Sequence, residues 1–183
     1  GWSLTLSVST YCLFAHRCLG YGQSRLSTTF SVGAATTVLT QILIFPRVVA
    51  WLGANAACSM GLLGVATGLC GFSLIWRQPV HTALYLLVRL GSGIADTSTA
   101  TLVAVDSKTP EERARNLSLI TSTRAAARIV TPMLSADLFE VSATHKTAPG
   151  ALPYLVASSL AGTLTPVPLL LKRKDEGEAS EVK

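Results

Sequence analysis

The feature that most constrains this 183-residue chain is a series of six long apolar segments separated by short polar stretches. At a rise of ~1.5 Å per residue, each segment is long enough as an α-helix to cross about 30 Å of hydrocarbon. The pattern therefore predicts an all-α membrane protein with six transmembrane helices. The expected spans are residues 2–19, 27–46, 54–76, 80–105, 116–138 and 150–171.

Composition supports the lipid bilayer as the surroundings of this chain. Hydrophobic residues make up 49% of the chain, charged residues only 14%, and the mean hydropathy is +0.46. Soluble domains carry about 25% charged residues. The net charge of +5 does not indicate a nucleic-acid partner, because the basic residues are scattered and no basic stripe is interleaved with aromatics.

The distribution of lysine and arginine predicts the orientation of the spans. Cytoplasmic loops of membrane proteins collect these residues, and the two sides of the expected bundle are unequal. One side holds eight of them and the other holds four, so the first side is expected to be cytoplasmic. An even number of spans then places both ends of this chain in the cytoplasm, in a plasma or an organelle membrane. The first set is Arg47, Lys108, Arg113, Arg115, Lys172, Arg173, Lys174 and Lys183, and the second is Arg17, Arg25, Arg77 and Lys146.

The two ends of the chain carry further expectations. Residues 172–183 are polar and charged, which is typical of a disordered tail. The chain begins with glycine and runs almost at once into an apolar segment, with no basic region before it. We therefore expect no signal peptide at this point, and a piece of a longer protein.

Charged residues lie well inside two of the apolar spans. Asp96 in the fourth span and Arg124 in the fifth lie about 13 Å and 12 Å from the same membrane surface, by helical rise. A charge at the centre of a lone membrane helix costs on the order of 2.5–3.5 kcal/mol. These side chains must therefore face protein or water, and we predict an Asp96–Arg124 ion pair. It forms part of a transport pathway or, alternatively, a structural clamp between two helices.

Three further polar side chains are expected in the same interior. Arg89 lies two turns before Asp96, Arg128 lies one turn after Arg124, and Gln41 lies in the second span. We expect these residues to line a pathway for substrate or a coupling ion. The interior then has three arginines and one acid, so the remaining positive charge is answered either by acids of a missing partner segment or by an anionic ligand.

Glycines mark one face of the third span. Gly61, Gly64, Gly68 and Gly71 are spaced by three and four residues, which places them on one side of a helix. Small residues allow the backbones of membrane helices to approach closely. We therefore expect this face to be a helix-packing surface.

No motif indicates catalysis, a metal or a cofactor. The sequence has no HExxH, GxSxG or GxxxxGK[ST] pattern, and GSGIAD at 91–96 has two residues too many for the GxGD motif of membrane aspartyl proteases. The four cysteines show no CxxC spacing, which argues against a metal site or a disulfide framework. Since the three histidines, His16, His81 and His145, fall at span ends or loops, we expect surface histidines. The chain is therefore not expected to be an enzyme.

The stretch TPEERARNLSLITSTRAAARIVTPML at 109–134 resembles the major facilitator superfamily, and within it the C-terminal half of drug-type and tetracycline-type proton antiporters. Pro110, Glu111, Glu112 and Arg113 match the P-E-E-R-G type loop between the tenth and eleventh helices of that family. The run 127–132 matches its A-R-I-x-G-P pattern, with threonine in place of the glycine.

The resemblance implies that the six spans correspond to helices seven to twelve of that fold. It implies the C-terminal half of a secondary active transporter, which moves a small molecule by alternating access and is proton-coupled in the antiporters. Arg47 and the run 110–113 would belong to its cytoplasmic gating loops, although FPRVVAWLG at 45–53 lacks the aspartate that is usual there. The expected partners are the bilayer, a small-molecule substrate, and a missing N-terminal half or a second copy. The alternative is a non-transporting six-helix scaffold or assembly protein.

Overall fold

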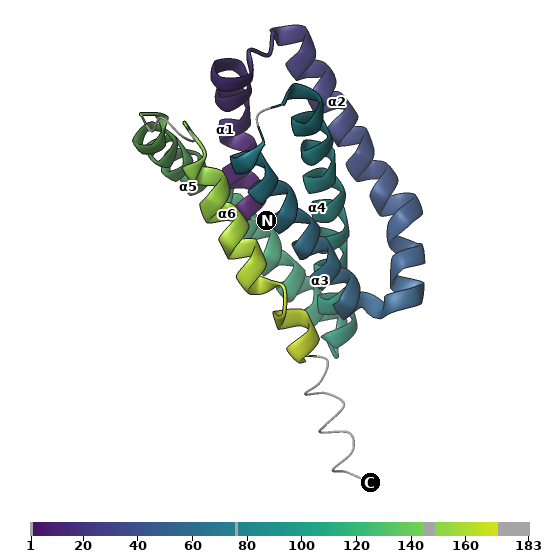
Figure 1. Cartoon of the computed structure of the whole chain (residues 1–183). Coiled ribbons are helices and arrows are strands. Elements are labelled where there is room, and N and C mark those ends of the chain that lie inside the picture. The colour runs from purple at the N-terminus through teal and green to yellow at the C-terminus, as the bar shows by residue number, and fades with distance from the viewer. Residues whose placement is uncertain (1, 76, 145–148, 172–183) are drawn as a thin grey trace.

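The computed structural model describes residues 2–75, 77–144 and 149–171, and this part of the chain is helical and contains no strand (Figure 1). The prediction of an all-α chain is confirmed. The helices are α1 (Trp2–Leu19), α2 (Gln23–Leu39), the π-helix η1 (Thr40–Ile44), α3 (Phe45–Leu74), α4 (Gln78–Asp106), α5 (Pro110–Ala143) and α6 (Leu152–Leu164). The predicted tail at 172–183 lies outside the described residues.

Two helical stretches of the described chain are long and apolar enough to cross a membrane. They are Gln23–Leu74, which joins α2, η1 and α3, and Leu152–Leu171, which extends α6. Six crossings therefore remain a prediction. The segment that departs most from the expectation is α5, which carries eight charged residues along its length: Glu111, Glu112, Arg113, Arg115, Arg124, Arg128, Asp137 and Glu140.

The start of α5 differs from the expected polar loop at 106–116. The Thr109 hydroxyl accepts a hydrogen bond from the Glu112 amide (3.1 Å), and the Glu112 carboxylate accepts one from the Lys108 amide (2.9 Å). Pro110 lies in the first turn, where its missing N–H costs nothing. The helix therefore begins at Pro110, and the connection to α4 shrinks to residues 107–109.

The chain turns sharply between α2 and α3, and we call residues Thr40–Gly53 the elbow. It begins with the π-helix η1 and ends at Gly53, whose φ of 79° and ψ of 163° interrupt α3. This backbone conformation is open essentially only to glycine. The elbow lies at the same end of the molecule as the end of α6 (Figure 1). The sequence predicts a break here, between spans two and three, but not its geometry.

Replacement of Gly53 by alanine is expected to lower the free energy of unfolding by about 1–3 kcal/mol, the usual cost of a strained backbone conformation. Gly162→Ala is the matched control, because a Cβ there meets nothing within 4 Å and its helix α6 favours alanine. Thermal unfolding of both variants in detergent, followed by circular dichroism, measures the difference. Equal melting temperatures would show that the elbow does not need the positive φ.

Helices α3 and α4 pack with their backbones in direct contact. The glycine face of α3 lies against Leu84, Val88, Gly91 and Ala95 of α4, and a Cβ built on Gly61 would lie 2.7 Å from the Ala95 nitrogen. Because real Cβ atoms do not come this close to backbone, only glycine fits. The predicted packing role of the glycine face is confirmed.

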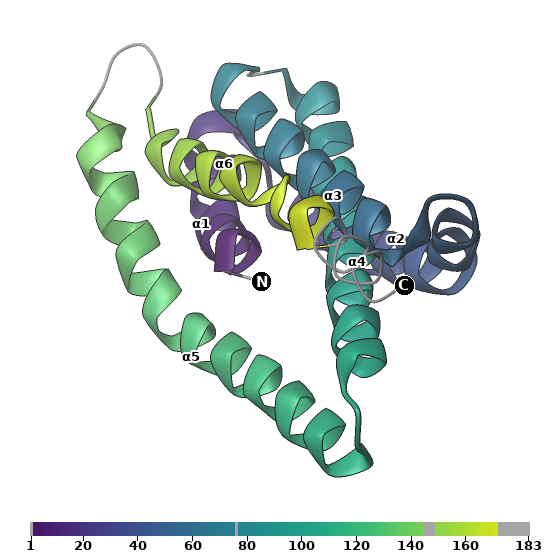
Figure 2. The ribbon, with the colours of Figure 1, turned by 90° about the horizontal axis from the view of Figure 1, so that it is seen from below.

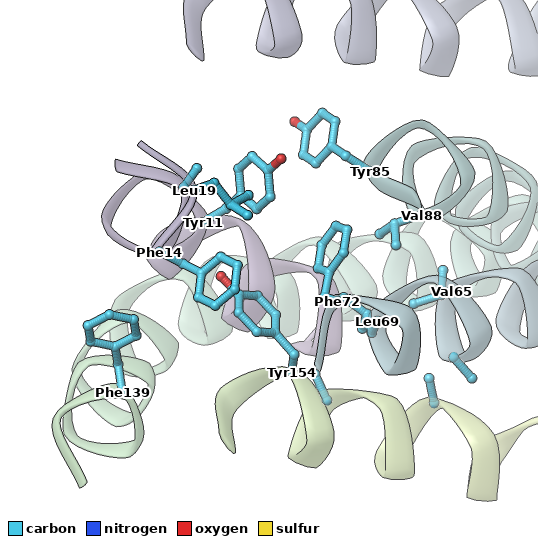
Figure 3. Packing of buried hydrophobic residues seen from close by; sticks show 14 of the residues in the cluster. Tyr11, Phe14, Leu19, Val65, Leu69, Phe72, Tyr85, Val88, Phe139 and Tyr154 are labelled. Atoms are coloured by element: carbon cyan, nitrogen blue, oxygen red, sulfur yellow. The ribbon is translucent and has the colours of Figure 1, made fainter. Parts of the chain in front are cut away.

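An aromatic core fills the end of the bundle opposite the elbow. It is built where α1, α3 and α5 end and where α4 and α6 begin, so each helix contributes from its terminal turns (Figure 3). Its large side chains include Tyr11, Phe14, Phe72, Tyr85, Phe139 and Tyr154. The rings of Tyr11 and Tyr85 stack at 4.9 Å, and Phe72 meets Tyr154 edge-on at 5.3 Å. This end of the molecule is therefore tightly closed.

His81 belongs to this core, which corrects the expectation of a surface histidine. It is fully buried, its ring stacks on Phe72 at 4.4 Å, and its Nδ1 lies 3.4 Å from the Tyr11 hydroxyl. The spacing of four residues between His81 and Tyr85 places both on one face of α4. That spacing is a sequence signal for burial of His81. The position of His81 near the end of the expected span 80–105 favoured a surface residue instead.

Helix α5 lies along the side of the bundle. It starts beside the end of α4 and diverges from it (Figure 2). Its second half packs against α1 and α6, and the residues buried there are Ala127, Thr131, Ser135, Phe139 and Ser142. Phe139 carries this far contact, since it belongs to the aromatic core. Between its two ends, most α5 side chains are exposed.

Candidate functional site

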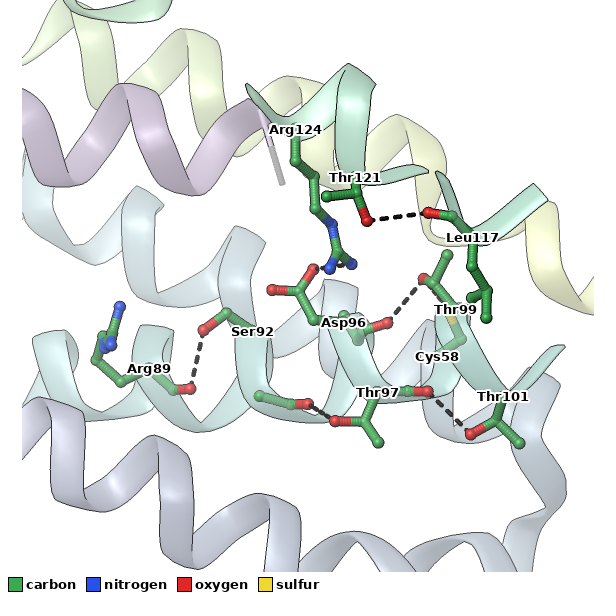
Figure 4. Close-up of polar contacts among 12 residues, drawn as sticks. Cys58, Arg89, Ser92, Asp96, Thr97, Thr99, Thr101, Leu117, Thr121 and Arg124 are labelled. Atoms are coloured by element: carbon green, nitrogen blue, oxygen red, sulfur yellow. Dashed lines mark hydrogen bonds and ion pairs between the residues drawn. The ribbon is translucent and has the colours of Figure 1, made fainter. Parts of the chain in front are cut away.

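The candidate site is an ion pair between α4 and α5. Arg124 Nη2 donates to Asp96 Oδ1 at 2.9 Å, and the two side chains are 35% and 38% exposed (Figure 4). The predicted Asp96–Arg124 pair is therefore confirmed as a contact. It bridges two helices that diverge from the short connection at 107–109. Among the described residues, it is the ion pair that the structure shows between α4 and α5.

The pair forms because both helices leave the same short connection. Asp96 lies ten residues before the last residue of α4 and Arg124 lies fourteen residues after the first residue of α5. These offsets correspond to about 15 Å and 21 Å along the two axes. The long arginine side chain spans the remaining difference, so the two charges meet several turns away from the connection, in a half-buried position.

Three threonines follow Asp96 along α4. The Thr97, Thr99 and Thr101 hydroxyls donate to carbonyls of their own helix at 2.8–2.9 Å (Figure 4). Since each hydroxyl proton is used within the helix, these oxygens act toward any further group only as acceptors. Cys58 Sγ of α3 lies 3.8 Å from the Thr99 hydroxyl, which connects this row to the glycine face.

The other expected pathway residues are not gathered at the pair. Arg89 reaches α2, where its Nε donates to the Gly33 carbonyl at 3.4 Å. Arg128 is exposed on α5, one turn beyond Arg124. Gln41 is exposed on η1, so the expectation that it faces the interior of this bundle is wrong. The π-helical turn rotates it outward, which the span pattern does not reveal.

The residues that the family resemblance assigns to cytoplasmic loops lie at one end of the molecule. Glu112 caps the start of α5, Glu111 and Arg113 are exposed in its first turn, and Pro110 begins the helix. Arg47 lies in the elbow, where its Nη1 donates to the Leu43 carbonyl at 2.8 Å. Within the described chain, each of these contacts is local to its own helix end, and none of them joins Arg47 to the start of α5.

The described residues contain no group of three or more His, Cys, Asp or Glu side chains that could hold a metal ion. The four cysteines, Cys12, Cys18, Cys58 and Cys70, are free thiols. The chemistry of the candidate site therefore consists of one carboxylate and one guanidinium. No protein-family model, no curated protein and no solved structure matches this chain.

Proposed function

We propose that this chain is the C-terminal six-helix half of a secondary active transporter, which moves a small molecule by alternating access. The observation that carries the proposal is the Asp96–Arg124 pair, which joins two diverging helices at a distance from the ends of both. Charges inside membrane helices are costly and mark substrate or ion pathways.

The charged side chains exposed on α5 support the proposal that a partner covers this helix. Arg128, Asp137 and Glu140 are exposed along this helix, and charged side chains of membrane helices almost always face protein or water. An N-terminal half, or a second copy, would cover them. Two bundles facing each other across a central site is the arrangement that alternating access uses.

The ion pair offers a simple coupling step. Protonation of the Asp96 carboxylate removes its charge and weakens the contact with Arg124. Helix α5 is then held to α4 mainly through their short connection, while its second half stays packed on α1 and α6, so its first half can shift relative to α4. The freed guanidinium presents a cation to the pathway, so proton binding and substrate binding would be linked at one contact.

Two-sided accessibility tests alternating access without knowledge of the substrate. A cysteine at Ala100 reports on the face of Asp96, because the two residues are one turn apart and Ala100 is half-buried. The experiment uses the full protein that cells produce, with its native cysteines replaced by alanine or serine. We expect a membrane-impermeant thiosulfonate to modify this cysteine from either side of sealed vesicles.

Thr67→Cys is the matched control, since Thr67 is exposed on α3, within the apolar stretch 23–74, where lipid should shield it. Modification at position 100 from neither side would favour the scaffold alternative. Modification from one side only would indicate a closed crevice, and it would contradict alternating access.

A further inference from the structure

The elbow carries an apolar groove on its outer surface. The groove has a volume of about 410 Å³, within the range of roughly 300–1,000 Å³ usual for ligand pockets. Its lining is Ile44, Arg47, Val48, Trp51, Leu52 and Met60, so every lining side chain except Arg47 is apolar. The Asp96–Arg124 pair contributes nothing to it.

Trp51 is the most exposed large side chain of this groove. It is 88% exposed, and Leu52 beside it is 50% exposed. The elbow interrupts the apolar stretch Gln23–Leu74, one of the two that could cross a membrane. Tryptophan is enriched where such stretches meet the headgroup region, because its ring is apolar and its N–H is polar. The groove therefore lies where lipid would touch it.

Arg47 has no acidic partner within the described part of the chain. Its Nη1 is bound to the Leu43 carbonyl, and no carboxylate of the described residues forms an ion pair with it. Asp96 is the first acidic residue of the chain, so the sequence around the elbow offers no counter-ion either. A guanidinium has five donors, and those that remain suit the oxygens of a phosphate.

We propose that the elbow groove binds an anionic phospholipid of the surrounding bilayer, with the lipid phosphate on Arg47 and an acyl chain against Trp51, Leu52 and Met60. The positive charge at the mouth and the apolar lining beneath it match the two halves of such a lipid. Basic pockets on the cytoplasmic side of membrane helices bind anionic headgroups in this way, and the lysine and arginine distribution places Arg47 on that side. This inference does not depend on transport.

Fluorescence quenching tests the site directly. The other tryptophans, Trp2 and Trp76, are replaced by phenylalanine, which leaves Trp51 as the only reporter. The protein is reconstituted in phosphatidylcholine vesicles with a small fraction of phosphatidylglycerol, and one lipid at a time carries brominated acyl chains. We expect the apparent affinity of brominated phosphatidylglycerol for the Trp51 site to exceed that of brominated phosphatidylcholine about fivefold, as one basic residue near an anionic surface implies.

Arg47→Gln should make the two lipids equal, whereas Arg113→Gln, at an exposed arginine of the α5 start, should keep the preference. Equal quenching with Arg47 intact would overturn the proposal, because Trp51 would then report ordinary interfacial lipid. Absence of quenching by either lipid would also overturn it, and would show that protein covers the groove. Neither result bears on transport, because the accessibility of position 100 tests transport separately.

Discussion

Asp96→Asn is expected to change the ratio of the modification rates from the two sides, for a cysteine at position 100, by about threefold. The substitution removes the charge that holds Arg124 at 2.9 Å. A contact worth about 0.6 kcal/mol in one conformation changes the ratio of two conformations about threefold. Loss of the pair should therefore shift the protein toward one of its two states.

The effect on folding should be small by comparison. Polar contacts between membrane helices contribute about 0.6 kcal/mol on average and at most about 1.7 kcal/mol. Both partners here are more than a third exposed, which lowers the contribution further. Asp96→Asn should thus shift the melting temperature only slightly, while it changes the balance of accessibility between the two sides measurably.

Charge exchange separates the pathway from a clamp. The double variant Asp96→Arg with Arg124→Asp restores an ion pair between α4 and α5, and a clamp would regain its full function. If the carboxylate takes up a proton at position 96 as part of a pathway, the double variant should regain stability but not the original balance of accessibility between the two sides. Arg115→Gln, at an exposed residue of α5, is the control for the loss of a single charge. If Asp96→Asn alters neither folding nor accessibility, the pair has neither role.

Gly91→Ala is expected to destabilise the bundle by about 1–3 kcal/mol, and Gly91→Val by more, because added atoms overpack the α3–α4 contact. A Cβ at Gly91 would lie 2.7 Å from the Gly61 carbonyl oxygen and 2.9 Å from the Val65 nitrogen. Both are backbone atoms, so no side-chain rotation relieves the clash. The two helices would have to separate along the contact that positions Asp96.

Gly64→Ala provides a sharp control within the same interface. Its Cβ would meet its nearest neighbour, the Gly91 Cα, at 3.5 Å, which is an ordinary contact. Alanine also favours the helix over glycine by up to about 1 kcal/mol, so this variant should be as stable as the parent or slightly more stable. Thermal unfolding in detergent distinguishes the two positions. Equal stability of Gly91→Ala and Gly64→Ala would mean that the close approach of α3 and α4 is not present in the folded protein.

The sequence predicted the features that depend on helical periodicity. The position of α1, the limits of α4 within two residues, the glycine face and the Asp96–Arg124 contact all follow from spacing and rise. A charge in an apolar span leaves few positions for its partner. These features were predictable because each depends on one or two helices.

The features that the sequence did not predict depend on local backbone choices or on the packing of several helices. The π-helical turn at Thr40–Ile44 and the positive φ of Gly53 redirect the chain and expose Gln41. His81 is buried because Tyr11 and Phe14 of α1 and Phe72 of α3 stack on its ring at the start of α4. Arg89 binds α2 at Gly33, a contact that no periodicity within α4 reveals.

The central claim is that α4 crosses the membrane and carries Asp96 into it, although α4 is not one of the two most apolar helical stretches. Single cysteines at Arg77 and Lys108, at the two ends of α4, test this claim most directly in sealed vesicles of known orientation. We predict that an impermeant maleimide modifies position 108 from the cytoplasmic side only and position 77 from the opposite side only. Modification of both positions from the same side would contradict the membrane-spanning bundle and the transport proposal with it.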